Sequence, residues 1–185
     1  MQSTIFIIIA AGLVLYFIIT YNRFIRSHNL VKEAWSGIDV QLKRRHNLIP
    51  NIVETVKGYS KHEKQLLEDI VLVRSNVDKA SSVNERGETE IALSKSLRNL
   101  FAVAESYPEL KANENFIELQ KELSEMEKDI SLARRYYNGA VRNLNILVES
   151  FPGSLVAQLT GFKQADYFEI EYAVQREAPD VKFSE

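Results

Sequence analysis

The sequence contains no cysteine and few residues that interrupt helices. Of its 185 residues none is Cys, seven are Gly and four are Pro. The missing cysteine excludes disulfides, thiolate nucleophiles and cysteine-ligated zinc or iron–sulfur centres. Scarce glycine and proline are expected of long helices, because these two residues have the lowest helix propensity. The roughly 160 residues after the N-terminal segment are enough for one domain with a sizeable core.

Charge is absent from the N-terminus. No charged side chain occurs between Met1 and Asn22, and residues 5–19 are almost wholly aliphatic or aromatic. At about 1.5 Å of rise per residue, roughly 17 to 20 helical residues match the hydrocarbon thickness of a bilayer. We expect a transmembrane helix over residues 5–22, in contact with membrane lipids, after a short non-cytoplasmic N-terminus over residues 1–4.

Two other kinds of segment also begin with an apolar run. A buried core helix rarely stands at the extreme N-terminus without a polar stripe. A cleavable signal peptide usually starts with basic residues and ends at small residues of the A-x-A type. This chain has no Lys or Arg among residues 1–4, and its apolar run ends in Thr20, Tyr21, Asn22 and Arg23. The transmembrane interpretation is therefore favoured.

Positive charge follows the apolar segment. Arg23, Arg26 and Lys32 come just after it, so the positive-inside rule predicts a single-pass inner-membrane protein with a cytoplasmic C-terminal domain. Residues 23–64 hold nine Lys or Arg against four Asp or Glu, a balance of +5, which leaves −7 for the remainder of a chain of net charge −2. This polarity indicates either positive-inside bias with solvated helix faces, or a surface for anionic headgroups or an acidic partner.

A heptad-like stripe follows the predicted span. Positions 35, 38, 42, 45, 49, 52 and 56 hold Trp, Ile, Leu, Arg, Ile, Ile and Val, which predicts an amphipathic, coiled-coil-like helix continuing from the membrane. Arg45 breaks the stripe, and it could pair with a buried acid, mark an interface or reveal a kink. Pro50 predicts that the helix kinks or restarts, with Asn47 as a possible N-cap.

Three further apolar stripes predict helices. After Gly58, a second helix is expected, followed by a polar link from Ser81 to Arg86 that Gly87 ends, and then a third helix that Pro108 stops. The second stripe contains Leu66, Ile70, Val73, Val77 and Ala80, and the third contains Leu93, Leu97, Leu100, Ala104 and Tyr107.

The most regular stripe comes last. It begins after Asn113, a plausible N-cap, and ends at the sequence Phe151-Pro152-Gly153-Ser154. Its members are Phe116, Leu119, Leu123, Met126, Ile130, Ala133, Tyr137, Ala140, Leu144, Leu147 and Phe151. Residues 155–162 predict a short helix, and the tail from Ala178 is expected to be loosely ordered.

These stripes predict an all-α fold, in which an N-terminal transmembrane helix continues into an antiparallel up-and-down bundle of long helices. The expected boundaries are residues 23–162 for the cytoplasmic bundle and 163–185 for a C-terminal tail.

No catalytic motif is present. His28, His46 and His62 form no H-E-x-x-H or E-x-x-H pair, and the sequence has no G-x-S-x-G, P-loop or G-x-G-x-x-G. We expect no enzymatic activity, metal, cofactor or small-molecule substrate. Nucleic-acid binding is not expected either, because it normally requires a basic overall charge.

Seven stretches of the sequence carry a recognisable pattern: residues 34–45, 48–51, 53–59, 107–112, 133–138, 151–152 and 161–162. Taken together and in order, they resemble the bacterial LemA family. The resemblance implies a short non-cytoplasmic N-terminus, one membrane helix and a cytoplasmic helical bundle, with no established enzymatic activity, and a magnetosome-associated relative implies a role in membrane organisation. Gly139 and His46 are small departures from the family pattern.

Polar residues in these stretches are the candidates for an interface. Most lie off the apolar stripes, so packing in a core does not account for them, whereas Trp35, Ile38 and Leu42 are better explained by packing. The candidates are Asp39, Lys43, Arg44, Arg45, Asn51, Glu54, Lys57, Arg134, Arg135, Tyr136 and Asn138.

The functional hypothesis is a membrane-anchored scaffold or adaptor that binds protein partners, or copies of itself as a homo-oligomer, at the cytoplasmic face of the membrane. The alternative is a lipid-binding protein that organises or remodels membranes. An enzyme would instead require a pocket with converging polar groups.

Overall fold

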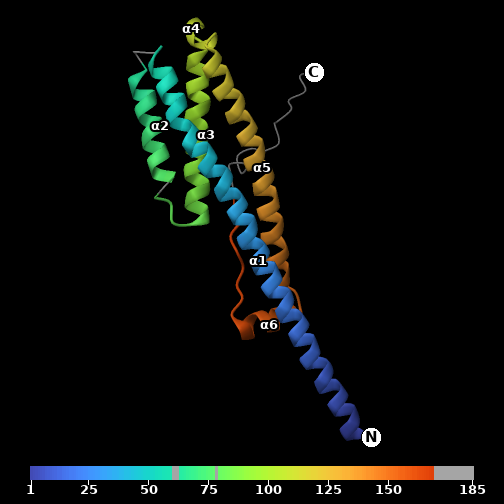
Figure 1. Cartoon of the computed structure of the whole chain (residues 1–185). Coiled ribbons are helices and arrows are strands. Elements are labelled where there is room, and N and C mark those ends of the chain that lie inside the picture. The colour runs from blue at the N-terminus through green and yellow to red at the C-terminus, as the bar shows by residue number, and fades with distance from the viewer. Residues whose placement is uncertain (60–62, 78, 169–185) are drawn as a thin grey trace, which may run out of the picture. The chain divides into compact units, whose positions relative to one another are not determined.

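The structure, a computed structural model, describes residues 1–59, 63–77 and 79–168, and these form helices and no strand (Figure 1). The predicted all-α class is confirmed. The predicted loose tail from Ala178 lies outside the described residues. The helices are α1 Gln2–Lys57, α2 Lys64–Val77, α3 Val83–Ala104, α4 Pro108–Lys111, α5 Glu114–Glu149 and α6 Gly153–Thr160.

Helix α1 is continuous over 56 residues, which confirms that the apolar N-terminal helix runs into the first bundle helix. Pro50 lies inside it, so the predicted restart with Asn47 as N-cap is wrong. Proline has no N–H, and the carbonyl four residues earlier therefore loses its helical donor. That carbonyl belongs to His46, and Arg74 Nε of α2 donates to it at 3.3 Å. A side chain from another helix thus replaces the missing backbone donor.

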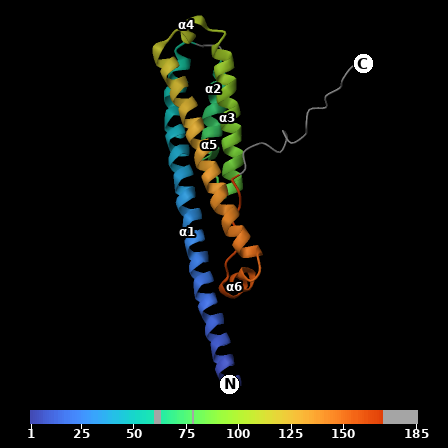
Figure 2. The same cartoon turned by 90° about the vertical axis from the view of Figure 1, so that its right-hand side faces the viewer.

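The described chain divides into two compact units. Unit 1 comprises Met1–Arg44 and Met126–Tyr167, and the described part of unit 2 comprises Arg45–Glu125 and Phe168. In unit 1, α1 and α5 are antiparallel: the Trp35 ring lies 5.4 Å from that of Tyr137, and Arg44 pairs with Asp129 at 3.8 Å (Figure 2). Their facing stripes are buried as predicted, at Ile38, Leu42, Ile130, Tyr137, Ala140 and Leu144.

Unit 2 is also built from antiparallel neighbours. The Phe101 ring near the end of α3 lies 5.6 Å from that of Phe116 in the first turn of α5. Tyr107 donates to Glu63 at 3.2 Å, and Asn113 donates to Tyr59 at 2.9 Å, so the turns at this end of the unit are tied together. The core contains Ile49, Ile52, Val56, Leu67, Ile70, Leu93, Leu97, Leu100 and Leu110.

Helix α3 begins earlier than the sequence suggested. Ser82 is its N-cap and forms a capping box with Glu85, so the predicted polar link from Ser81 to Arg86 is wrong, and Gly87 is a buried residue inside the helix. Hydrogen bonds from the backbone N–H and hydroxyl of Ser81 and from the Ser82 N–H lower the pKa of Glu85. The S-x-x-E pattern outweighs the helix-breaking tendency of glycine here.

The other predicted boundaries are close to those observed. Asn113 caps α5, since its Oδ1 accepts from the Phe116 N–H at 3.0 Å. Helix α5 ends at Glu149, just before the predicted Phe151–Ser154 break, and α6 confirms the short helix predicted there.

After α6 the chain returns along α5 within unit 1. The Tyr137 hydroxyl donates to the Asp166 carbonyl at 2.9 Å, and burial raises the pKa of this phenol. The Asn145 amide makes two bonds with the Ala165 backbone, at 3.0 and 2.9 Å. Two side chains of α5 thus hold this returning segment in place.

The role of Arg74 can be tested with a double-mutant cycle. Arg74→Met should destabilise the protein by about 1 to 2 kcal/mol, because the His46 carbonyl loses a donor. In a Pro50→Ala background the cost should be smaller, since an alanine at position 50 would supply a backbone N–H to the same carbonyl. Thermal unfolding in detergent, followed by circular dichroism, measures both values. Equal costs in the two backgrounds would contradict this role.

Candidate functional site

The predicted interface residues of α1 in unit 1 take part in surface ion pairs. Lys43 Nζ lies 3.7 Å from Asp39 Oδ2, and Arg44 NH1 lies 3.8 Å from Asp129 and 3.1 Å from the Gln41 amide oxygen. Pairs this exposed contribute little to stability. Asp39, Lys43 and Arg44 therefore form an accessible, mixed-charge surface, and their interface role stays a prediction.

The candidates on α5 belong to the same unit. Arg135 and Tyr136 are exposed, the latter by 54%, whereas Arg134 and Asn138 are half-buried. The neighbouring Tyr137 is the aromatic residue that packs on Trp35 of α1. Tyr136 consequently presents a large ring to the outside of unit 1, and its role in binding stays a prediction.

In unit 2, Asn51, Glu54 and Lys57 are all exposed on α1. They lie in the last two turns of the helix, next to the apolar residues Ile52 and Val56 of the core. Of these three predicted residues, the structure places Lys57 at the edge of a groove.

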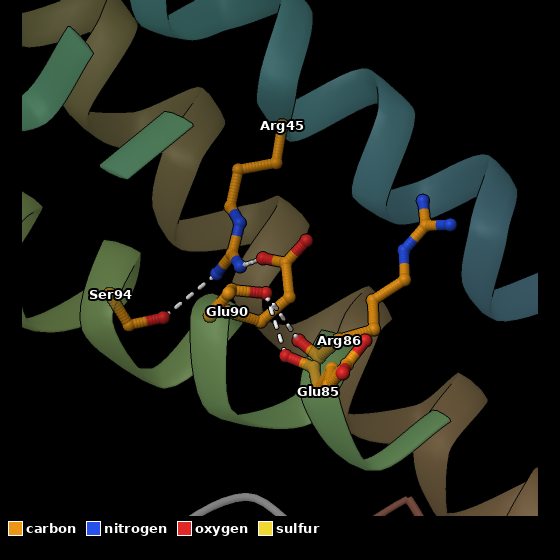
Figure 3. A network of polar contacts seen from close by, with 6 residues as sticks. Arg45, Glu85, Arg86, Glu90 and Ser94 are labelled. Atoms are coloured by element: carbon orange, nitrogen blue, oxygen red, sulfur yellow. Dashed lines mark hydrogen bonds and ion pairs between the residues drawn. The ribbon is translucent and has the colours of Figure 1, made fainter. Parts of the chain in front are cut away.

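Arg45 is not at the surface. Its side chain is 2% exposed and pairs with Glu90 of α3, which is 1% exposed (Figure 3). Arg45 NH1 also donates to Ser94 Oγ at 2.8 Å. Of the three interpretations of this residue, pairing with a buried acid is therefore the one observed.

Glu90 was missed by the sequence analysis, although a signal was present. The α3 stripe contains Leu93, Leu97 and Leu100, and extending it three residues backwards reaches Glu90. The two stripes thus each carry one charge, of opposite sign, at a position otherwise reserved for apolar residues. Such a pair fixes which turns of α1 and α3 face each other, because misalignment would leave a charge buried without its partner.

Unit 2 has an open groove between α1 and α2. It has a volume of about 730 Å³, within the range of sites that bind ligands or peptide segments. Its lining comes from Val53 and Lys57 of α1 and from one face of α2: Lys64, Leu67, Glu68, Val71, Leu72 and Ser75. These α2 residues recur every three or four positions, so the groove follows the helix for about 16 Å.

The groove is apolar in its middle and charged at one end. Val71 is 50% exposed and Leu72 is 61% exposed, so both present large apolar side chains to solvent. Lys64 lies 3.6 Å from Glu68, and Lys57 adds a further positive charge. Such a surface suits the apolar face of a helix better than it suits a small polar substrate.

The described residues offer no evident metal-binding site. No group of three or more His, Asp and Glu side chains among them is arranged to hold a metal ion. In unit 2, the pair of Arg45 and Glu90 is buried, and Ser94, to which Arg45 donates, is half-buried. The groove is therefore the feature on which a functional proposal can be built.

The buried pair generates a stability prediction. Arg45→Met should cost about 3 to 5 kcal/mol, because it leaves the Glu90 carboxylate buried without its cation. The double variant Arg45→Met/Glu90→Leu should recover most of this loss. As a control, Lys43→Met removes an exposed pair and should cost less than about 1 kcal/mol. Chemical unfolding of each variant in the same detergent gives the values. A double variant as unstable as the single one would show that the pair itself is not the cause.

Comparison with known proteins identifies the family of this chain. Residues 34–183 match the model of the LemA family. Protein LemA of Metamycoplasma hominis is 28% identical over 188 residues, which cover 98% of this chain and 82% of that protein. Magnetosome protein MamQ 2 of Paramagnetospirillum magneticum is 25% identical over 175 residues. Magnetosome protein MamQ of Magnetospirillum gryphiswaldense is 22% identical over 174 residues.

The magnetosome relatives are longer than this chain. Each alignment covers 80% of this chain but 64% of the relative, so the chain spans less than two thirds of their length. None of these names states a reaction. Because the family model extends over most of the sequence, the chain belongs to the LemA family.

Proposed function

We propose that this protein is a membrane-anchored helical scaffold. Residues 5–22 of α1 cross the inner membrane with the N-terminus outside, and the bundle binds a helix of a protein partner in the cytoplasm. The groove between α1 and α2, with Val71 and Leu72 exposed, is the observation that carries the proposal.

The anchor is supported by length, composition and exposure. Helix α1 contains an 18-residue window with a mean hydropathy of 2.5, of which 6% is buried. All of residues 1–19 are exposed, so this segment does not serve as a core helix of the described fold. Arg23, Arg26 and Lys32 follow it, which supports a cytoplasmic position for the bundle.

The shape and charge of the groove favour a helical occupant. A stretch of about 16 Å accommodates roughly three helical turns, which is the length over which residues at i, i+3, i+4 and i+7 present one face. The apolar middle would receive that face. Lys57, at the rim, favours a partner with an acidic residue at the corresponding end of its helix.

Self-association uses the same chemistry. A second copy of the chain could supply the helix, which would make the protein a homo-oligomer. The magnetosome relatives support an association of this protein with membranes. The following experiment identifies the partner.

Site-specific photocrosslinking in native membranes tests this function. A photoreactive residue at Leu72 should give protein adducts that are lost when Val71→Asp introduces a charge into the groove. A probe at Leu132, which is 61% exposed on α5 in unit 1, is the matched control and should not give these adducts. Mass spectrometry then shows whether the trapped segment is an amphipathic helix of another protein or of a second copy. If the Leu72 probe traps lipid alone, or only uncrosslinked monomer is recovered, the scaffold proposal is wrong.

A further inference from the structure

Helix α6 is held against α1 by aromatic contacts within unit 1. The Phe162 ring stacks on Phe24 with centroids 4.9 Å apart, and it also lies 6.0 Å from the Tyr21 ring. Gly161, at φ 79°, allows the chain to turn at the end of α6 and bring Phe162 into this position. Figures 1 and 2 both show α6 beside the N-terminal half of α1. The helix is therefore fixed at one level of α1.

The start of α6 is equally close-packed. A Cβ atom at Gly153 would lie 2.6 Å from the Leu147 carbonyl oxygen, so only glycine fits there without a shift of the backbone. Val156 and Ala157 are buried at 4% and 2% exposure. One face of α6 thus belongs to the core of unit 1.

Helix α6 lies beside the part of α1 where its exposed apolar segment ends. Residues 1–19 are exposed, whereas Thr20 and Phe24 are buried. If residues 5–22 fill the hydrocarbon of the bilayer, α6 lies where α1 leaves it, at the boundary between acyl chains and headgroups.

The outer face of α6 is apolar. Leu155 and Leu159 are four residues apart, which places them on the same face, and they are 52% and 78% exposed. Phe151, just before the helix, is 81% exposed. Three large apolar side chains therefore project from a short segment next to the predicted membrane anchor. Large apolar side chains exposed together on so short a segment point to an interaction site.

Polar donors occur at the same level of unit 1. Arg23 and Ser27 of α1 and Asn143 of α5, with Ile146 and Leu147, line a cavity of about 330 Å³. Lys163 is exposed just after α6. The acidic neighbour Glu149 accepts a hydrogen bond from Gln164 at 2.7 Å. Cationic and amide groups beside an apolar face are the combination that lipid phosphates and acyl chains require.

We propose that α6 is a second membrane contact: it lies in the interface of the leaflet from which α1 emerges, with Phe151, Leu155 and Leu159 among the acyl chains. The inference rests on the membrane span of the proposed function. A bilayer is favoured over a protein as the occupant because the apolar face of α6 lies beside the end of the exposed apolar segment of α1. The two apolar surfaces therefore adjoin each other, and one bilayer would cover both. The partner of this surface is thus lipid, whereas the groove of unit 2 receives a protein.

Spin labelling tests the inference on the full-length protein. The sequence has no cysteine, so a single introduced Cys carries the only label. Leu159→Cys is compared with Leu13→Cys, inside the predicted span, and with Leu132→Cys, on α5 about 25 Å from its C-terminal end. After reconstitution into vesicles of phosphatidylcholine and phosphatidylglycerol, the collision rates with oxygen and with a water-soluble nickel complex report the depth of each label.

We expect collisions with oxygen to exceed those with the nickel complex for the labels at positions 13 and 159, and the reverse for the label at position 132. The label at position 159 should lie roughly 5 to 10 Å below the headgroups. A label at Leu155 should agree with the one at Leu159. If Leu13 reports lipid but Leu159 is as accessible to nickel as Leu132, the α6 contact is wrong and the anchor stands. If Leu13 itself reports water, the span fails as well. A Leu159 label shielded from both reagents would indicate a protein partner and would also overturn the inference.

Discussion

The apolar side chains of residues 5–19 have to be removed from water, and the described fold leaves them exposed. Each Ile, Leu or Phe in such a run is worth roughly 1.5 to 3 kcal/mol when it is transferred to an apolar environment. The total exceeds the stability of an ordinary domain, so this segment favours association with a membrane. Helix α1 continues without a break from this segment to Lys57, and both units are built on it.

Both units have an apolar core with aromatic contacts between helices, and one of them adds a buried ion pair. In unit 1, the contacts are those of Phe24 with Phe162 and of Trp35 with Tyr137. In unit 2, the buried pair of Arg45 and Glu90 adds a constraint on alignment that apolar residues alone would not impose. Unit 1 carries the apolar face of α6, and unit 2 carries the groove. The two proposals thereby assign contacts with lipid and with protein to separate surfaces of the chain.

Much of the fold could be predicted because it depends on periodicity. The stripes of α1 and α5 gave most of the buried residues of both helices, although Phe151, at the end of the second stripe, is 81% exposed. Asn113 and the Phe151–Ser154 break gave the ends of α5. The errors arose where a contact in space overrides a local tendency. Pro50 does not interrupt α1 because Arg74 supplies the missing donor, and Gly87 does not delay α3 because Ser82 and Glu85 cap it earlier.

The candidate site was less predictable. Lys57 was identified from its polarity. Val71 and Leu72 lie off the apolar stripe of α2, which agrees with their exposure, but the groove that they form with α1 depends on how the helices of unit 2 are arranged. The sequence pattern of one helix does not contain that arrangement. The proposed role of α6 was likewise not predictable from its own sequence. Its outer face lies beside the apolar segment of α1 because Phe162 contacts α1, and that contact is known only from the structure.

The central claim, an anchored bundle with its N-terminus outside, is tested most directly by cysteine accessibility in spheroplasts. A membrane-impermeant maleimide is applied to Ser3→Cys and to Lys121→Cys, which is exposed on α5 in unit 2. The account predicts that Ser3→Cys is labelled in intact spheroplasts and that Lys121→Cys is labelled only after permeabilisation. Labelling of Lys121→Cys in intact spheroplasts, or loss of residues 1–4 from the mature protein by cleavage, would contradict it.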